Sequence, residues 1–326
     1  MIIVRSPLRI TLGGGGTDLP SYYLKNGGYV ISAAIDKYIY TTITRPFEEG
    51  IYLKYSDIES VNTVDEIQHP IFKEALKRMQ LKTPQIEITT VADIPSGTGL
   101  GSSSSFTVGL LKALYSHRRK SASAEFLADK ACSIEIDSLN APIGKQDQYI
   151  AAFGGITELH FQKGHMKPNV TPLNMDFDVM CELEENLLLF FTGFTRSANT
   201  ILKDQDDKTK NNNDSMIQNL DFVKKLGFAT RSALKKGSLF SFVALMNQHW
   251  ENKKARTKGM TNPQIDKWYE LGMNNGALGG KLVGAGGGGF LLFYAKDKEE
   301  LRTTMKKEGL EEVRFHFDFE GAKRLI

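Results

Sequence analysis

Hydrophobic and polar residues follow two periods along the chain, and together these periods predict a mixed α/β protein. Alternation between apolar and polar positions predicts strands at residues 1–11, 29–44, 51–55, 85–91 and 158–161. Apolar residues at helical spacing predict helices at residues 20–24, 70–79, 124–136, 215–235, 239–250 and 263–272. Toward the end of the chain the pattern predicts strands at 187–191, 282–283, 290–294 and 312–317, and a helix near 298–307.

The most polar stretch of the chain runs from Asp204 to Ser215 and is dense in charged and amide side chains. A segment of this composition has little apolar surface to bury, so we expect a mobile, solvated loop there. The composition leaves open whether this loop closes over a substrate.

A loop rich in glycine and hydroxyl residues, from Ile94 to Ser105, carries the main candidate chemistry. It lies between the predicted strand at 85–91 and an apolar-periodic stretch that begins at Val108. A strand, a glycine loop and a helix N-terminus together bind phosphate, because glycine lets the backbone approach and free N–H groups face the anion. The residues expected to bind the nucleotide are Pro95, Gly97, Thr98, Gly99, Leu100, Gly101, Ser102, Ser103 and Ser104.

The same loop could also be a Gly/Ser-rich turn that caps a helix, since serine is a common cap residue. It is not a P-loop, because no lysine follows Gly101. Its glycine spacing also differs from the dinucleotide-binding fingerprint. A nucleotide site here therefore requires a different architecture.

Composition narrows the class of protein without choosing one. The 326 residues suggest two domains, and 41 Lys and Arg against 38 Asp and Glu give no basic excess of the kind that nucleic-acid binding requires. Cys132 and Cys181 do not make a disulfide framework. The chain shows no signal-peptide core and no run of about 18 apolar residues, so we expect a cytoplasmic location and no membrane partner.

Three motifs, in a fixed order, resemble those of the GHMP kinases, the superfamily of galactokinase, homoserine kinase, mevalonate kinase and phosphomevalonate kinase. They span residues 7–18, 95–105 and 281–290. The resemblance implies a two-domain α/β (α+β) fold that binds ATP and a sugar in the cleft between its domains. It implies an N-terminal ATP-binding domain at 1–183, with a left-handed βαβ unit, and a ferredoxin-like C-terminal domain at 184–326.

The resemblance also assigns roles to single residues. Asp147 would accept the proton of the acceptor hydroxyl or orient that hydroxyl, and Arg9 would hold Asp147 ionised or stabilise charge on the transferring group. Ser103 and Glu135 would bind Mg²⁺. In the first motif, the residues expected to contact the substrate are Gly15, Gly16, Thr17 and Asp18.

The residues alone leave simpler interpretations open. Asp147 and Ser103 could cap helices, and Glu135 could lie on a solvated helix face. Asp18, after four glycines, could stabilise a turn. The glycines at 284–289 could form a flexible linker or, as the resemblance implies, a loop that packs against the first glycine loop. For the adenine base the family points to residues 52–65.

Details of the first motif indicate which sugar accepts the phosphate. Residues 14–18 lack the Glu-His pair of galactokinases. Together with residues 192–198, the motif resembles sugar 1-kinases that act on D-glycero-D-manno-heptose 7-phosphate, and fucokinase domains share much of it. That resemblance implies ATP-dependent formation of the 1,7-bisphosphate, on a route to nucleotide-activated heptose for bacterial capsule or lipopolysaccharide. Arg196, with Lys203 as a helper, is the expected ligand of the sugar's own phosphate.

Two other functions stay open at this point. One is a fucokinase-like 1-kinase for a neutral sugar, and the other is a sensor that binds a sugar or nucleotide without turnover. The expected partners are ATP and a small sugar phosphate, with no nucleic acid. The sequence leaves the oligomeric state open, with a homodimer as one option.

Overall fold

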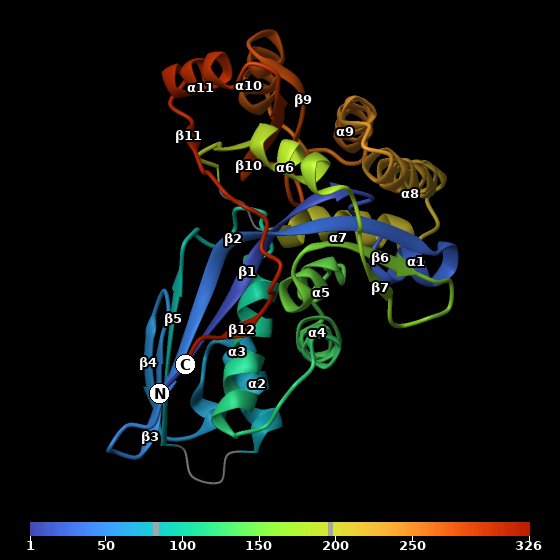
Figure 1. Cartoon of the computed structure of the whole chain (residues 1–326). Coiled ribbons are helices and arrows are strands. Elements are labelled where there is room, and N and C mark those ends of the chain that lie inside the picture. Colours follow the sequence, from blue (N-terminus) through green and yellow to red (C-terminus); the bar gives the residue numbers. More distant parts are fainter. Residues whose placement is uncertain (81–84, 195–197) are drawn as a thin grey trace.

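Two β-sheets organise the protein, whose computed structural model describes residues 1–80, 85–194 and 198–326 (Figure 1). Within these ranges the first sheet has eight strands in the order β12-β1-β2-β5-β3-β4, with β6 beside β2 and β7 beside β6. Its strands are β1 (Ile2–Gly13), β2 (Gly28–Thr44), β3 (Gly50–Lys54), β4 (Ile58–Val61), β5 (Gln85–Ala92), β6 (Ile156–Phe161), β7 (Asn169–Pro172) and β12 (Lys323–Arg324).

The long strand β2 is central because it has partners along its whole length. It pairs with β1, to which α1 (Pro20–Asn26) connects it, while β6 pairs with its first half and β5 with its second. Within the described ranges β3 and β5 are the one parallel pair, and α2 (Pro70–Met79) lies on the connection between them. This is a βαβ unit; its left-handed crossover stays a prediction.

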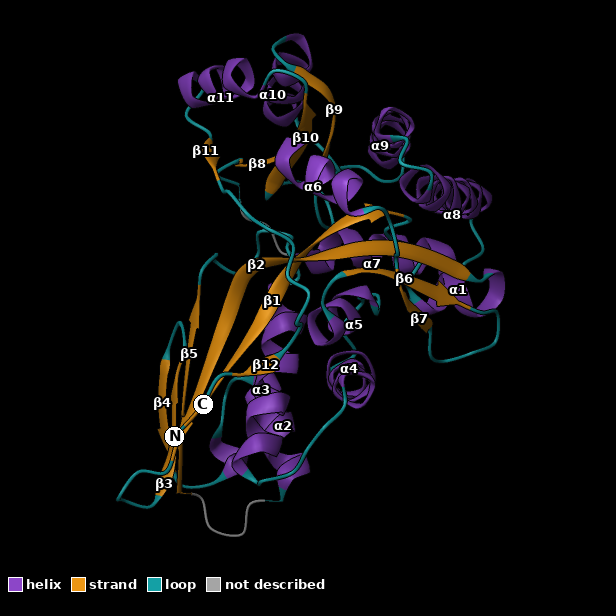
Figure 2. Ribbon diagram, viewed as in Figure 1, coloured by secondary structure: helices purple, strands orange, loops and turns teal. Residues whose placement is uncertain are grey.

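Helices cover one face of the first sheet (Figure 2). They are α2, α3 (Ser102–His117), α4 (Ala124–Cys132) and α5 (Gln146–Phe153). α3 packs on β1 and β2, and its apolar side chains Val108, Leu111 and Leu114 are buried in the core with Phe72. A π-helical turn, Ser133–Ser138, continues α4, so the helix predicted at 124–136 changes its pitch before it ends.

The second sheet confirms the ferredoxin-like arrangement. Its antiparallel strands follow the order β11-β8-β10-β9, and they are β8 (Leu187–Phe191), β9 (Ala277–Leu282), β10 (Phe290–Ala295) and β11 (Glu311–Glu312). The helices that pack on it are α6 (Phe177–Asn186), α9 (Leu239–Lys254), α10 (Pro263–Asn274) and α11 (Lys298–Lys307). Of the other two helices, α7 (Ala198–Lys210) packs on α1, and α8 (Asp214–Lys235) packs on β1, β2 and α9. None of the helices in the described ranges has both the length and the apolarity needed to cross a membrane. The domain boundary between residues 183 and 184 stays a prediction.

The loop expected at residues 204–215 is wrong, because most of this stretch is helix. In α7, Lys208 and Lys210 each form an ion pair with the aspartate four residues earlier. Gln205 lies on the buried face and donates to the carbonyl of Gly16. The buried face of α7 is therefore partly polar, and a search for apolar periodicity could not reveal it.

The strand expected at residues 312–317 is also wrong for most of its length. Only Glu311 and Glu312 form β11, and the chain then crosses to the first sheet, where the Asp36 amide donates to the carbonyl of His316. Phe315 and Phe317 are buried in a core shared by the two sheets. Their alternation reflects burial between the domains and not a strand ladder.

The third glycine-rich segment, residues 284–289, connects β9 to β10 and packs against the central loop. A Cβ built on Gly284 would lie 2.5 Å from the carbonyl oxygen of Gly99, and one built on Gly289 would overlap the carbonyl oxygen of Thr98. Only glycine permits two backbones to approach so closely. The linker interpretation is thus wrong, because residues 284–289 pack against the central loop.

We expect Gly289→Ala to destabilise the protein much more than Gly309→Ala. Both glycines have a positive φ, +99° and +81°, so both alanines meet a backbone strain of about 1–2 kcal/mol. A methyl group at Gly309 meets open space, whereas one at Gly289 meets the Thr98 carbonyl, which adds about 1–3 kcal/mol. Denaturant unfolding measures the difference, and equal losses of stability in the two variants would contradict the tight packing of the loops.

Candidate active site

A pocket of about 620 Å³ opens where the three glycine-rich segments meet. Such a volume is typical of small-molecule sites. Side chains from both domains line it, from β1 and α5 on one part and from α9 and β9 on the other. The glycines at its wall are Gly15, Gly16, Gly97, Gly99, Gly101, Gly284, Gly286 and Gly288, among others.

Arg9 and Asp147 form a bidentate ion pair that lines this pocket. The Nε atom of Arg9 donates to Oδ1 of Asp147 at 2.7 Å and Nη2 donates to Oδ2 at 2.8 Å. Its third nitrogen, Nη1, donates to the carbonyl of Gly99 at 2.6 Å. Arg9 is buried in β1, whereas the side chain of Asp147 is 23% exposed, in the first turn of α5. Asp147 is not a cap, because α5 begins after Lys145 without a side-chain capping bond.

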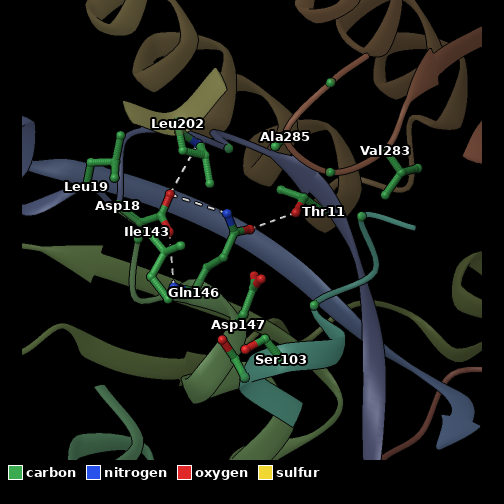
Figure 3. Close-up of a pocket in the computed structure, with 18 of the residues that line it drawn as sticks. Thr11, Asp18, Leu19, Ser103, Ile143, Gln146, Asp147, Leu202, Val283 and Ala285 are labelled. Atoms are coloured by element: carbon green, nitrogen blue, oxygen red, sulfur yellow. Dashed lines mark hydrogen bonds between the residues drawn. The ribbon is translucent and has the colours of Figure 1, made fainter. Parts of the chain in front are cut away.

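Asp18 is buried in the same pocket, where it binds Gln146, the residue before Asp147 in the chain (Figure 3). Its carboxylate accepts from the amide of Gly16 and from both the amide and the side chain of Gln146, at 3.1 to 3.3 Å. Burial raises the pKa of Asp18, and the charge of Asp147 raises it further. The turn interpretation is therefore partly right, since Asp18 does bind the backbone of its own loop, but it also lines the pocket.

Ser103 and Glu135 face each other in the same pocket. The hydroxyl of Ser103 donates to Oε1 of Glu135 at 2.8 Å, and Nε2 of the Gln148 side chain donates to Oε2 at 2.8 Å. Glu135 lies in the π-helical turn and is only 3% exposed, so it is not on a solvated helix face. α3 begins after Gly101 with no side-chain capping bond, so Ser103 is not a cap.

The pair fits a magnesium ion. No cation is among the groups that act on the Glu135 carboxyl in the described residues, and burial raises its pKa, which a bound cation would oppose. Within the described ranges no group of three or more His, Cys, Asp or Glu side chains could hold a metal. Mg²⁺ takes few ligands from protein and the others from phosphate and water, so a serine and one carboxylate suffice as its protein ligands.

The central loop leads into the N-terminus of α3. Gly99 and Gly101 have φ values of +82° and +80°, which side chains rarely adopt. The hydroxyl of Ser102 is buried, lines the pocket and has no hydrogen-bond partner in the described part of the chain, which fits a phosphate oxygen as its partner. Free N–H groups of a helix start favour the same ligand. The expected loop residues Gly97, Gly99, Gly101, Ser102, Ser103 and Ser104 all line the pocket.

Four of the residues expected to contact ATP or the substrate do not line the pocket and make hydrogen bonds within the surrounding loops. Thr17 donates its hydroxyl to the carbonyls of Gly14 and Tyr29 and is fully buried. Thr98 donates to the carbonyl of Pro95, and the carbonyl of Leu100 accepts from the Arg9 amide. None of Thr17, Pro95, Thr98 and Leu100 is among the residues that line the pocket.

Two expectations fall elsewhere. Arg196 lies outside the described residues, so the structure does not place it. Residues 52–65, expected near the adenine base, belong to the β3–β4 hairpin and its vicinity and do not line the pocket, whereas Pro70 and Ile71 do.

Sequence reasoning missed a basic group in the pocket wall: His249, Lys253, Arg256 and Lys281. All four are buried, and burial together with Arg9 lowers the pKa of Lys281 to about 7. One signal was available, since the first three residues are spaced four and three apart, as on one helix face. Basic residues near a helix C-terminus are common, however, so the spacing alone does not indicate a site.

Known proteins match this chain along its full length. The model of the GHMP kinases N terminal domain matches residues 70–155, and that of the GHMP kinases C terminal matches residues 230–309. The chain is 30% identical to D-glycero-alpha-D-manno-heptose 7-phosphate kinase of Campylobacter jejuni, over 99% of this chain and 98% of that protein. It is also 30% identical to L-fucokinase/L-fucose-1-P guanylyltransferase of Bacteroides fragilis, over 90% of this chain but 34% of that longer protein.

Solved structures agree with the sequence matches. A D-glycero-D-manno-heptose 1-phosphate kinase from Bacteroides thetaiotaomicron superposes with a TM-score of 0.82 at 26% identity, and covers 100% of this chain and 99% of its own. A putative sugar kinase from Campylobacter jejuni gives 0.78 at 28% identity, over 99% and 97% of the two chains. With its fold, its pocket motifs and these full-length relatives, the chain belongs to the GHMP kinases, a superfamily of phosphotransferases.

Proposed function

We propose that this protein is a sugar kinase that transfers the γ-phosphate of ATP to the anomeric hydroxyl of D-glycero-D-manno-heptose 7-phosphate. The observation that carries the proposal is the carboxylate of Asp147, which Arg9 holds in one orientation at the pocket, beside the loop that fits phosphate. During the transfer, the acceptor hydroxyl has to contact the Asp147 carboxylate while the central loop holds the γ-phosphate next to it. A site in which the carboxylate and the loop are neighbours can therefore align the hydroxyl with the γ-phosphate.

The acceptor is inferred from the relatives. The Campylobacter jejuni protein named for heptose 7-phosphate matches this chain over nearly the whole length of both, and the heptose kinase structure does so too. The fucokinase relative supports the second candidate, a 1-kinase for a neutral sugar, because its identity is equal. The chain spans about a third of that protein, whose name also includes a guanylyltransferase.

In the proposed complex the central loop binds the phosphates of ATP through backbone N–H groups at the start of α3 and through the hydroxyl of Ser102. These donors neutralise charge that develops on the transferring group. Ser103 and Glu135 would hold Mg²⁺, as GHMP kinases generally use it with ATP. When bound, the ion would withdraw negative charge from the phosphate oxygens.

The transfer itself breaks the bond between the γ-phosphorus and the oxygen that bridges it to the β-phosphate. A new bond forms between that phosphorus and the sugar's anomeric oxygen, and ADP leaves. Asp147 lies where it can accept the hydroxyl proton or orient the hydroxyl toward phosphorus. Asp18 and its bonded partner Gln146 present oxygen and nitrogen atoms to other hydroxyls of the sugar.

The product of this reaction would be heptose 1,7-bisphosphate. We infer a role in making nucleotide-activated heptose for capsule or lipopolysaccharide, with the cytoplasm as the place of the reaction, where ATP is available. Turnover separates this function from a sensor that binds the same ligands without catalysis.

The acceptor is tested with a panel in an assay that couples ADP release to a signal. We expect the highest kcat/KM with heptose 7-phosphate, and lower values with L-fucose and D-galactose. A preference for L-fucose would overturn the heptose proposal in favour of the neutral-sugar kinase. The absence of turnover with every sugar would favour the sensor.

We expect Asp147→Asn to lower kcat by about 10²- to 10⁴-fold, the usual contribution of a proton-transferring side chain. The amide keeps the shape of the carboxylate but loses its charge and its ability to accept a proton. The KM for ATP should change little, because the nucleotide loop is untouched. Steady-state kinetics measure both values, and an undiminished kcat in a folded variant would rule out the role of Asp147.

We expect Glu135→Gln to raise the Mg²⁺ concentration needed for half-maximal rate by about 10-fold or more, since loss of even an outer partner of a metal costs about that much. Asp137→Asn is the matched control, because Asp137 is in the same π-helical turn but exposed. Titration of the rate with MgCl₂ measures the effect. The same Mg²⁺ dependence in both variants would contradict the metal site.

A further inference from the structure

The basic group in the pocket wall is built by two adjacent elements. His249 and Lys253 lie one turn apart on α9, and Arg256 follows just after the helix ends. Lys281 comes from β9, on which α9 packs (Figure 1). Each of the four side chains lines the pocket, and none is more than 8% exposed.

None of these cations forms an ion pair in the described part of the chain. Nζ of Lys253 donates to the carbonyls of Leu282 and Gly284, at 3.0 and 2.5 Å. Nζ of Lys281 donates to the carbonyl of Leu12 at 3.0 Å. An ammonium group has three N–H donors, so these bonds use two of them on Lys253 and one on Lys281.

Arg256 is also bonded only to uncharged oxygen atoms. It donates to the side-chain oxygens of Asn219 and Gln205, and makes longer bonds of 3.5 Å to the carbonyl of Gly15. Burial lowers its pKa to about 10, and the charge of Asp18 opposes that shift. Burial and neighbouring cations also lower the pKa of Lys253. Buried charges of one sign are costly unless an opposite charge joins them.

His249 adds an independent observation. Neither nitrogen of its buried ring has a hydrogen-bond partner in the described part of the chain, and the same is true of the neighbouring indole N–H of Trp250. Both residues line the pocket. Buried polar atoms are normally satisfied, so this wall requires a ligand that brings acceptor oxygens. A ligand with negative charge as well as oxygens meets the needs of the cations too.

The position of Arg256 places that ligand near the sugar end of the pocket. Its Nη1 would lie 2.5 Å from a Cβ built on Gly16, and Gly15 accepts its longer bonds. Both glycines belong to the motif expected to contact the acceptor. In the described part of the chain, Arg256 and Lys281 make no hydrogen bond to the central loop, where the phosphates of ATP are expected, or to residues that pack on it. Lys253 makes none to that loop either, but it donates to Gly284, which packs against Gly99 of the loop.

We propose that His249, Lys253 and Arg256 form a second anion subsite, which binds the phosphate that the acceptor sugar already carries. The inference rests on the proposed function and deepens it, because it names the residues that select a phosphorylated sugar. A phosphate at the far end of a sugar lies across the ring from the anomeric hydroxyl, so its ligands have to lie apart from Asp147. Lys281 feels the charge of Arg9 and donates to the carbonyl of Leu12 in β1, so it adds positive charge to the wall near the ion pair.

The test compares Lys253→Met with Lys254→Met. Methionine keeps the unbranched stem of lysine and removes the charge. Lys254 is the neighbouring residue of α9, but it forms an ion pair with Glu251 and does not line the pocket. The measurement is the ratio of kcat/KM for heptose 7-phosphate to kcat/KM for heptose without the phosphate. We expect Lys253→Met to lower this ratio by about 10- to 100-fold, the range for a lost hydrogen bond to a charged group, and Lys254→Met to leave it near the wild-type value.

A direct binding measurement removes the dependence on turnover. With a non-hydrolysable ATP analogue in the nucleotide site, inorganic phosphate should raise the Tm of the wild-type protein and of Lys254→Met, but not that of Lys253→Met. Arg256→Gln serves as the second variant if circular dichroism shows that Lys253→Met does not fold, and it should also lose the shift.

The outcomes separate the two proposals. If the wild-type protein does not phosphorylate heptose 7-phosphate, the proposed function is overturned. The ratio of kcat/KM is then measured on the sugar that the protein does phosphorylate, with and without a phosphate at the far end of that sugar. A wild-type preference for the unphosphorylated sugar would overturn the subsite. An unchanged ratio in Lys253→Met, or an equal phosphate-dependent Tm shift in that variant, would overturn it as well.

Discussion

The ion pair between Arg9 and Asp147 fixes three separate parts of the chain in one arrangement. Arg9 reaches from β1 to the first turn of α5 through two nitrogens, and to the central loop through the third. Its own amide also donates to the carbonyl of Leu100, in the same loop. The carboxylate that faces the acceptor and the loop that fits phosphate are therefore set relative to each other before any ligand binds. Such preorganisation is what phosphoryl transfer asks of a protein.

Around this pair the pocket keeps charges that its own residues do not neutralise. Burial raises the pKa of Asp18 and of Glu135, whereas it lowers that of Lys281 and of Lys253. Each shift expresses the cost of holding an ion away from water. A site of this kind is less stable alone than with a charged ligand bound, which is a common compromise between stability and function.

The sequence indicated the parts of the site that depend on local backbone requirements. Close approach of backbones needs glycine, so the central and third loops could be located from residues 97–101 and 284–289 alone. Asp147, Ser103 and Glu135 were identified by resemblance, since capping or solvation explained each of them equally well from local sequence. Their burial and mutual bonds, which exclude those explanations, exist only in the folded protein.

Buried polar side chains are the part of the structure that a pattern of apolar residues cannot predict. The face of α7 that carries Gln205 is buried through hydrogen bonds. On α9 the basic residues His249 and Lys253 continue a buried face that is otherwise apolar, formed by Leu239, Phe242, Val243, Met246 and Trp250. Helix α6, which no pattern predicted, buries only Leu183 fully. Phe315 and Phe317 show the opposite error. Their apolar alternation predicts a strand, but they lie in a segment that crosses from one sheet to the other and is buried between them.

The final residues of the chain complete its first strand. Lys323 and Arg324 pair with β1, and the last two residues exchange backbone bonds with Ile3, so the two ends lie side by side (Figure 1). On the ribosome, β1 is made long before β12, so the outer edge of β1 stays without this partner until β12 has been synthesised. Until then the nascent protein carries an open strand edge, a state that invites pairing with other chains.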